Sequence, residues 1–137
     1  MQIRPATVAD RPGVVALWNR IFPDDPPHNA PEKVFDAKLA TGDGMLIVVQ
    51  DGGLIIGTAM AGYDGHRGWL YKVAVAPEYR RRGIARALVD HAVRALRTKG
   101  CTKVNLQIRP TNADVRKFYE SIGFMPEERL NMGMHIG

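Results

Sequence analysis

Apolar residues recur every three or four positions in four stretches of the chain, which is the spacing of an amphipathic helix. The first stretch follows Thr7 and Asp10, a pair that resembles a capping box with Asp in place of the usual Glu. The longest stretch ends at Gly100, where a helix C-cap is expected. The pattern predicts helices from about Val8 to Phe22, Pro31 to Ala40, Gly83 to Lys99 and Ala113 to Ile122.

Runs rich in β-branched residues, or alternating apolar with polar residues, predict the strands. Turns at residues 51–53 and 64–65 separate three of these runs, which are therefore expected to form an antiparallel meander. Residues 23–31 contain four prolines and are expected to form an irregular loop. The predicted strands are Ile3 to Arg4, Met45 to Gln50, Leu54 to Tyr63, Trp69 to Ala76, Lys103 to Arg109 and Leu130 to Ile136.

The order of these elements, β-α-α-β-β-β-α-β-α-β, indicates a domain of the α/β (α+β) class. We expect a mixed, mostly antiparallel sheet of about six to seven strands flanked by four helices, with one strand-helix-strand crossover. A single domain is expected to span residues 1–137, because a chain of this length buries one continuous core but not two ordinary ones.

Composition and charge limit the classes of protein to which the chain can belong. Hydrophobic residues make up 45% and charged residues 24%, which is typical of a soluble globular protein. No apolar run is long enough to cross a bilayer and no signal peptide is recognisable, so we expect a cytoplasmic protein without a membrane partner. Cys101 is the only cysteine, which excludes an intrachain disulfide, and the histidines lack the spacing of a metal site. A formal charge of +5 favours anionic partners, either nucleic acids or phosphorylated cofactors.

The segment from Val73 to Ala85 leads from a buried strand through a basic turn directly into the longest predicted helix. The first amides of a helix lack internal partners, and the helix dipole adds partial positive charge there, so such a turn can hold a diphosphate. Gly83 lets the backbone approach a phosphate closely, and the arginines beside it can make charge-assisted contacts. The alternative is a solvated basic run before an ordinary helix. The position between strand and helix favours the phosphate site.

This turn resembles the signature of the GCN5-related N-acetyltransferases, which is Arg or Gln, two residues, Gly, one residue, then Gly or Ala. Arg80, Gly83 and Ala85 stand at those positions. The resemblance extends to the preceding strand ending, Val-Ala-Val-x-Pro at residues 73–77.

A second block of the same family is matched further along the chain. Asn112, Tyr119 and the pair Gly123-Phe124 resemble the family's Asn, Tyr and Gly-Phe positions, although Ala is commoner where Val115 stands. The resemblance covers most of the chain and is weakest in the first 44 residues.

The resemblance implies a transfer of the acetyl group from acetyl-CoA to a primary amine of a small molecule or a protein. The pantetheine arm would pair with the backbone of residues 73–75, in a gap between this strand and the strand at residues 103–109, as an added strand does. Amides of residues 81–86 would hold the pyrophosphate. The residues implied to bind the cofactor are Val73, Ala74, Val75, Arg80, Arg81, Arg82, Gly83, Ile84, Ala85, Arg86 and Asn112.

Acetyl transfer to an amine needs a neutral nucleophile, a donor for the thioester oxyanion and an acid for the departing thiolate. In the family, the amide at the position of Val73 is the usual donor and the tyrosine at the position of Tyr119 is the usual acid. The alternative for Tyr119 is an aromatic core residue packed beside Phe118 and Phe124.

The general base has no assignment in this sequence. Trp69 and Tyr71 stand on the strand where the family often carries an acidic residue or histidine. An unshifted tyrosine has a pKa near ~10, so Tyr71 is better suited to position a water or substrate than to remove a proton. Asp64 and His66 in the neighbouring turn are candidates, although a lone histidine in a turn is usually just solvated.

Three other interpretations stay open. His28, Asp24 and Asp25 lie in the proline-rich loop, which borders the acceptor side in this family, and the alternative is a plain surface loop. A basic nucleic-acid-binding module would show a wider basic stripe or exposed stacking aromatics, so we expect no nucleic-acid partner. A CoA-binding sensor without catalysis would keep the fold and lose the base.

The acceptor is not specified by the sequence, and either a monomer or a homodimer is compatible with it.

Overall fold

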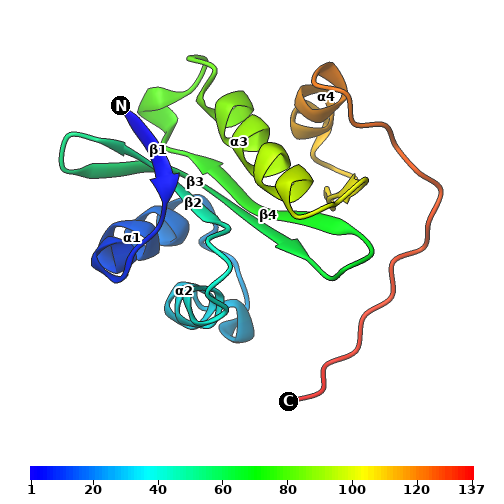
Figure 1. Ribbon diagram of the computed structural model, residues 1–137, viewed down its shortest axis with the longest axis horizontal. Helices are drawn as coiled ribbons and strands as arrows, with labels where there is room; N and C mark the ends of the chain where they lie inside the picture. The colour runs from blue at the N-terminus through cyan, green and yellow to red at the C-terminus, as the bar shows by residue number, and fades with distance from the viewer. The chain divides into compact units, whose positions relative to one another are not determined.

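The computed structural model describes residues 1–137, which divide into two compact units, Met1–Gln107 and Ile108–Gly137. The first unit holds a sheet and three helices, and the second holds one helix and the C-terminal segment (Figure 1). The single domain that the chain length indicates stays a prediction.

The first unit is built on a five-stranded sheet whose strands are neighbours in the order in which they occur in the chain. The first four strands pair antiparallel, and the fifth is parallel to the fourth. Because a helix connects these last two strands, they form the predicted crossover, and the predicted fold class is confirmed. The strands are β1 (Gln2–Pro5), β2 (Leu46–Asp51), β3 (Leu54–Tyr63), β4 (Gly68–Val75) and β5 (Val104–Asn105).

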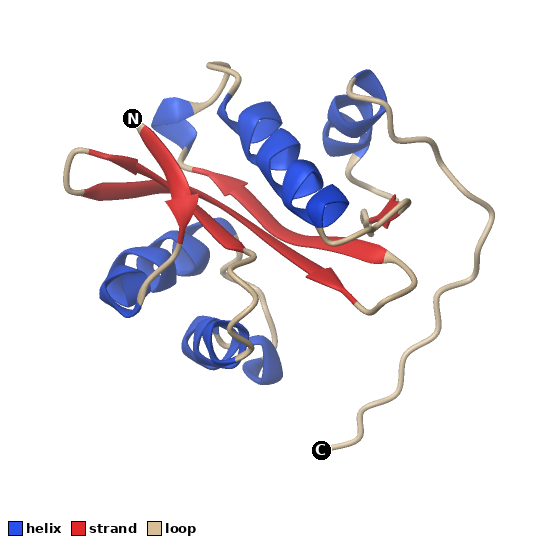
Figure 2. Cartoon of the chain, viewed as in Figure 1, coloured by secondary structure: helices blue, strands red, loops and turns tan.

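The four helices begin and end within a few residues of their predicted positions. α1 and α2 lie on one face of the sheet and α3 lies on the other, while α4 belongs to the second unit (Figure 2). None of them is long and apolar enough to cross a membrane. Their bounds are Arg11–Ile21 for α1, Pro31–Ala40 for α2, Ile84–Thr98 for α3 and Ala113–Ser121 for α4.

Apolar clusters hold these helices on the sheet. One cluster joins Trp18 of α1 with Phe35 of α2 and Val48 of β2, all with at most 1% of their surface exposed. A second cluster includes Leu88 of α3 and Ile56 of β3. Burying a large apolar side chain contributes about 1.5 to 3 kcal/mol, so this packing fixes how α1, α2 and α3 lie against the sheet.

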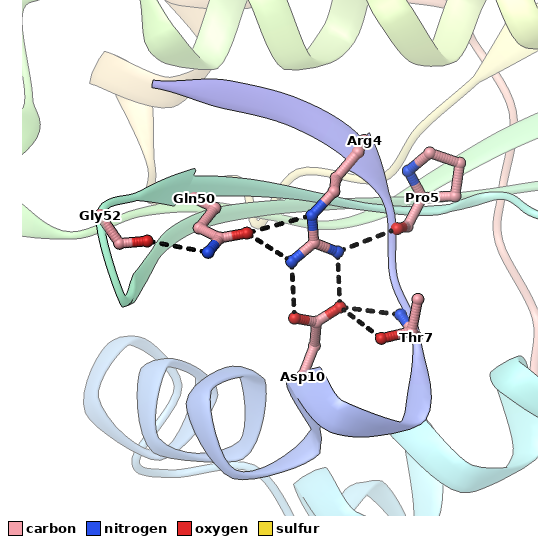
Figure 3. A network of polar contacts seen from close by, with 6 residues as sticks. All are labelled: Arg4, Pro5, Thr7, Asp10, Gln50 and Gly52. Carbon is pink, nitrogen blue, oxygen red and sulfur yellow. Dashed lines mark hydrogen bonds and ion pairs between the residues drawn. The ribbon is translucent and has the colours of Figure 1, made fainter.

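A polar network ties β1 to the start of α1 (Figure 3). Arg4 donates to both carboxylate oxygens of Asp10 at 2.7 and 2.8 Å, and also to the side-chain oxygen of Gln50 on β2. The same carboxylate accepts the backbone N–H of Thr7 at 2.7 Å, which confirms the capping interaction predicted there. The hydrogen bonds from Arg4 are the main cause that lowers the pKa of the buried Asp10 below its ordinary value of 3.8.

Two strand predictions were wrong. The strand predicted from Lys103 to Arg109 is limited to Val104–Asn105, because only these residues find partners on β4. No strand forms at Leu130–Ile136, so the sheet has five strands rather than the six to seven expected. The apolar side chains of that segment are 84 to 89% exposed, and alternation alone does not make a strand where no neighbouring strand satisfies its backbone.

The proline-rich loop is also more regular than predicted. Pro27–Asn29 forms a short 3-10 turn, which leads through Ala30 into α2. Asn29 and Ala30 donate their backbone N–H groups to Pro26 and Pro27 within the loop itself.

Cys101 is a free, buried cysteine. Its thiol donates to the backbone oxygen of Lys103 at 3.3 Å. A Cβ atom at Gly68 would lie 2.8 Å from the sulfur of Cys101 and 3.1 Å from a methyl group of Leu96. The first residue of β4 is therefore a glycine because α3 and the chain that follows it approach too closely for any side chain.

Candidate active site

A β-bulge interrupts β4 just before its last residues. The register pairs Tyr71 with Met60 and Ala74 with Thr58, so Lys72 and Val73 together lie opposite a single residue of β3. Lys72 has a left-handed backbone, with φ of 50°. A bulge leaves the extra residue outside the ladder of hydrogen bonds. The backbone of Val73, which the sequence assigned to the oxyanion, is therefore displaced from regular pairing with β3.

On its other edge, β4 has a strand partner only at its start. Gly68 pairs with Val104 and Trp69 with Asn105, and no further pair joins β4 to β5. Figure 2 shows β5 as a short arrow beside the beginning of β4. The last part of β4, residues 73–75, thus has no strand partner on this edge. The gap that would receive pantetheine stays a prediction.

The turn before α3 is the second part of the site. A 3-10 turn at Pro77–Tyr79 follows β4, and α3 begins at Ile84. Arg81 and Gly83 have φ of 63° and 75°, so the backbone bends through two left-handed residues. Only glycine adopts this conformation without strain, which explains Gly83; the non-glycine residue at 81 is uncommon.

The N-terminus of α3 has no side-chain cap. Its first internal hydrogen bond runs from the N–H of Ala87 to the oxygen of Gly83, so the amides of Ile84, Ala85 and Arg86 precede the helical ladder. A Cβ atom at Gly83 would meet no atom within 4 Å, so there is open space beside Gly83, the residue that precedes these amides. Open amides at a helix N-terminus are suited to an anion.

The four arginines around this turn are all exposed, but they differ in what they contact. Arg80 donates to the backbone oxygen of Val75 at 3.3 Å, at the end of β4. Arg82 lies over the ring of Tyr79, 5.0 Å from its centre, and the hydroxyl of Tyr79 donates to Asp51 at 2.7 Å. The turn therefore has cationic side chains on its surface, and two of them are held near β4 and the 3-10 turn.

An ion pair fastens the 3-10 turn to α1. Arg20 donates two hydrogen bonds to the carboxylate of Glu78, at 2.8 and 2.7 Å. These bonds are the main cause that lowers the pKa of Glu78 to about 2. Glu78 is therefore ionised and paired, and it is no candidate for the general base.

Tyr119 and Asn112 belong to the second unit. Asn112 lies just before α4 and caps it, because its side-chain oxygen accepts the N–H of Val115 at 3.4 Å. Tyr119 is buried and makes edge-on ring contacts with Phe118 and Phe124, at centroid distances of 4.9 and 5.5 Å. Burial raises the pKa of Tyr119 to about 12. The aromatic contacts expected for a packing role are present, and the hydroxyl stays protonated at neutral pH.

Two of the other titratable candidates, Tyr71 and Asp64, are unsuited to act as the base. The ring of Tyr71 stacks on that of Trp69, and burial together with the charge of Asp64 raises the pKa of Tyr71 above 10.0. Asp64 accepts the backbone N–H groups of His66 and Arg67, both at 2.7 Å, and these bonds lower its pKa. The carboxylate of Asp64 therefore stabilises the turn that contains it and is held by that turn's backbone.

The structure also brings together residues that the sequence analysis did not connect. Lys72 at the bulge forms an ion pair with Asp25 of the proline-rich loop. A lysine inside the otherwise apolar run from Trp69 to Val75 is the signal that would have pointed to this pair.

Comparison with known proteins identifies the family. The model of the acetyltransferase (GNAT) family matches residues 12–124. An acetyltransferase of Sodalis glossinidius is 37% identical to this chain over an alignment of 137 positions, which covers 99% of this chain and 96% of that protein. The chain belongs to the GNAT acetyltransferase family. The family that the turn at Arg80 to Ala85 indicated is thus confirmed.

Solved structures agree with this acetyltransferase fold. An aminoglycoside N-acetyltransferase in complex with CoA superimposes with a TM-score of 0.82 at 23% identity, over 98% of this chain and 93% of that one. A ribosomal-protein-alanine N-acetyltransferase from Escherichia coli gives a TM-score of 0.75 at 24% identity, over 89% of this chain and 76% of that one. At these identities the likeness shows that this GNAT acetyltransferase shares their fold.

Proposed function

We propose that this GNAT protein is an N-acetyltransferase that moves an acetyl group from acetyl-CoA to a primary amine by direct attack. The observation that carries the proposal is the uncapped N-terminus of α3, with open space beside Gly83. It follows, after one turn, a strand whose last residues lack a partner on one edge. Membership of the acetyltransferase family supports the reaction class.

The residues of the turn fit the anionic part of the cofactor. The amides of Ile84, Ala85 and Arg86 are available for the pyrophosphate, and exposed guanidinium groups, such as that of Arg81, can reach further phosphate oxygens. The unpaired edge at residues 73–75 is suited to the amide groups of pantetheine. Acetyl-CoA itself supplies an acetyl group activated as a thioester.

The groups of this chain that would act on the reaction are a backbone amide and a hydroxyl. The N–H of Val73, released from regular pairing by the bulge, is proposed to donate to the oxyanion that develops as the amine nitrogen bonds to the acetyl carbon. As the bond between carbon and sulfur breaks, Tyr119 is proposed to give its proton to the departing thiolate. The attacking nitrogen then gives up the proton that it no longer needs as an amide, directly or through water, and this proton restores the hydroxyl of Tyr119. Its pKa of about 12 keeps that proton in place at neutral pH.

No side chain of the described site is assigned as general base. We therefore propose that the acceptor amine binds in its neutral form, after losing its proton to water. The rate should then rise with pH until the amine itself is neutral in solution. This dependence differs from that of an enzyme with a carboxylate or histidine base, whose rate levels off at the pKa of that base.

The acceptor is proposed as a class rather than a compound. Proteins of the same fold include an aminoglycoside N-acetyltransferase and a ribosomal-protein-alanine N-acetyltransferase. Both small and protein amines therefore belong in a first screen. Suitable members are an aminoglycoside, glucosamine 6-phosphate and a peptide with an N-terminal alanine.

The test measures thiol release from acetyl-CoA with each amine, together with the thermal shift that CoA causes. Gly83→Glu should abolish the thermal shift, because a side chain and a negative charge would occupy the space beside the amides of α3. Gly83→Asn is the matched control, since Asn tolerates a left-handed backbone and adds no charge. Wild-type affinity for CoA in folded Gly83→Glu would exclude the proposed phosphate site.

A second candidate function is a CoA-binding sensor or interaction domain without catalysis. The missing base is the observation that favours it. CoA binding that is lost in Gly83→Glu, with no thiol release for any amine of the screen, would support this alternative over the transferase.

A further inference from the structure

The ammonium group of Lys72 lies among one carboxylate and two aromatic rings. Its nitrogen is 2.5 Å from a carboxylate oxygen of Asp25, 4.5 Å from the ring centre of Phe22 and 5.8 Å from that of Trp18. The side chains of Lys72 and Asp25 are only 14% and 17% exposed. Because little solvent reaches this ammonium group, its attraction to the carboxylate and the ring faces is only weakly screened. The contact therefore stabilises the fold more than an ion pair on the surface does.

The backbone of the same lysine is held from the opposite direction. The hydroxyl of Thr58 donates to the backbone oxygen of Lys72 at 2.8 Å. That hydroxyl also accepts the indole N–H of Trp18 at 2.9 Å, and Thr58 and Trp18 are both fully buried. Trp18 thus contacts the ammonium with its ring and, through Thr58, supports the carbonyl of the bulge.

The proline-rich loop, residues 23–30, also forms hydrogen bonds within itself. Asp25, Asn29 and Ala30 donate their backbone N–H groups to oxygens of Phe22, Pro26 and Pro27, all within the loop or at its start. Prolines have no N–H to offer. The ion pair between Asp25 and Lys72 reaches from this loop to the bulge of β4.

From this geometry we infer that Asp25 and Lys72 are positioning residues for acetyl transfer, an inference that rests on the proposed function. Their ion pair fastens the proline-rich loop to the two-residue bulge that contains Val73. The loop and the amide of Val73, which is proposed to bind the oxyanion, are then held rigidly together. Releasing the pair lets the bulge shift, so the amide of Val73 meets the developing oxyanion in poorer geometry.

The expected effect is on turnover rather than on cofactor affinity. Lys72→Met keeps the length of the side chain and removes the charge, and it should lower kcat about 10- to 100-fold, as misplacement by about 1 Å does. Asp25→Asn should act in the same direction. The double variant should lose no more than the worse single variant, because both changes break one interaction. Lys72→Arg keeps the charge and should stay within a few-fold of the wild type.

A matched ion pair elsewhere in the chain separates positioning from general stability. Lys38 of α2 pairs with Asp43 at 2.7 Å, with side chains 12% and 26% exposed, and also donates to the backbone oxygen of Ala61. Asp43→Asn should therefore lower the melting temperature as the Lys72 and Asp25 variants do, while kcat stays at the wild-type value.

The experiment combines three measurements on the full chain: the Kd of CoA by calorimetry, kcat with the best amine of the screen, and hydrogen exchange of residues 24–30. We expect Lys72→Met to bind CoA as the wild type does, to turn over more slowly, and to exchange the loop amides faster. Unchanged kcat, or a loss of kcat matched by Asp43→Asn at equal stability, would overturn the inference. A wild-type protein that binds no CoA and releases no thiol would refute the proposed function, and with it the positioning role. Hydrogen exchange would still report in that case whether the pair holds the loop.

Discussion

The indole N–H of Trp18 donates to the hydroxyl of Thr58 at 2.9 Å, in a part of the sheet where neither side chain reaches solvent. The same hydroxyl donates to the backbone oxygen of Lys72. A single small side chain thus satisfies one buried donor and one acceptor at the bulge. No buried side-chain nitrogen or oxygen of the structure is left without a partner.

Thr58→Val should therefore destabilise the protein although it keeps the shape of the side chain. It leaves the indole N–H and the carbonyl of Lys72 unsatisfied, and each buried group of this kind costs about 1 to 3 kcal/mol. Urea unfolding measures the loss in the free energy of unfolding. Thr58→Ser, which keeps the hydroxyl and loses one methyl group, should cost only about 1 kcal/mol. If valine were as stable as serine, the hydrogen bonds of Thr58 would contribute nothing.

The ion pair of Arg4 and Asp10 should make stability depend on acid pH. Because the folded pKa of Asp10 lies below its ordinary value of 3.8, the unfolded chain binds this proton first as the pH falls. The ion pair therefore stabilises the folded protein fully at pH values above 3.8, the ordinary pKa of Asp10. This stabilisation disappears as the pH falls through the lower pKa of Asp10 in the folded protein. Urea unfolding between pH 2 and pH 7, on the wild type and on Asp10→Asn, isolates this term as the difference between the two curves. The difference should be large near neutrality and vanish in strong acid; a difference that is constant with pH would contradict it.

Gly68→Ala should destabilise the start of β4. The added methyl group would lie 2.8 Å from the sulfur of Cys101, and overpacking of this kind typically costs about 1 to 3 kcal/mol. Combining it with Cys101→Ala removes the sulfur and should recover part of the loss, so the two changes should not be additive in urea unfolding. Full additivity would show that the sulfur is not what excludes a side chain.

CoA fragments should bind in an order that follows their phosphates. Calorimetry with CoA, dephospho-CoA and pantetheine should show a small loss on removing the 3′-phosphate and a large one on removing the diphosphate, since the diphosphate is proposed to lie against the amides of α3. Raising the salt concentration should weaken CoA binding, because the arginines of the turn are exposed and screened. Pantetheine binding as tightly as CoA would argue strongly against this site.

Tyr119→Phe should lower turnover more than it lowers acetyl-CoA affinity. The ring keeps its contacts with Phe118 and Phe124, whereas the proton for the thiolate is lost. General acid catalysis is typically worth ~10²- to 10⁴-fold, or about 2.7 to 5.4 kcal/mol of barrier. With the tyrosine present, the acid should not titrate below its pKa of about 12, so the rate should not decline between pH 8 and pH 10. An unchanged rate in the Phe variant, when chemistry limits turnover, would leave Tyr119 as a packing residue only.

The sequence predicted most of the fold because its periodic segments are long and clearly bounded. α2 and β3 have the bounds that their patterns indicated, and Gly100 lies just past the end of α3 as expected for a C-cap. The predictions that were wrong concern segments whose state depends on a neighbour. Alternation at residues 103–109 and 130–136 is compatible with a strand, but it contains no information on whether a partner lies alongside.

The candidate site also has a part that a local motif predicts and a part that depends on distant residues. The turn at Arg80 to Ala85 is local, so the family could be identified from its motif. Asp25 and Lys72 are 47 residues apart, and their pairing depends on the bulge and on the direction in which the loop leaves α1. No local pattern specifies such a contact. A charged residue within a buried strand indicates that a partner exists, but not which residue it is.

The strand order of the sheet bears on how the chain folds. Each strand pairs with the strand that follows it in the chain, and three of the four pairings join segments that are separated by a turn or by one helix. Closing such short loops costs little entropy, and chains with local contacts fold quickly. The backbone pairing of β2, β3 and β4 joins no residue beyond Val75, so the strands at the centre of the sheet can pair during synthesis before α3 is made and packs against them.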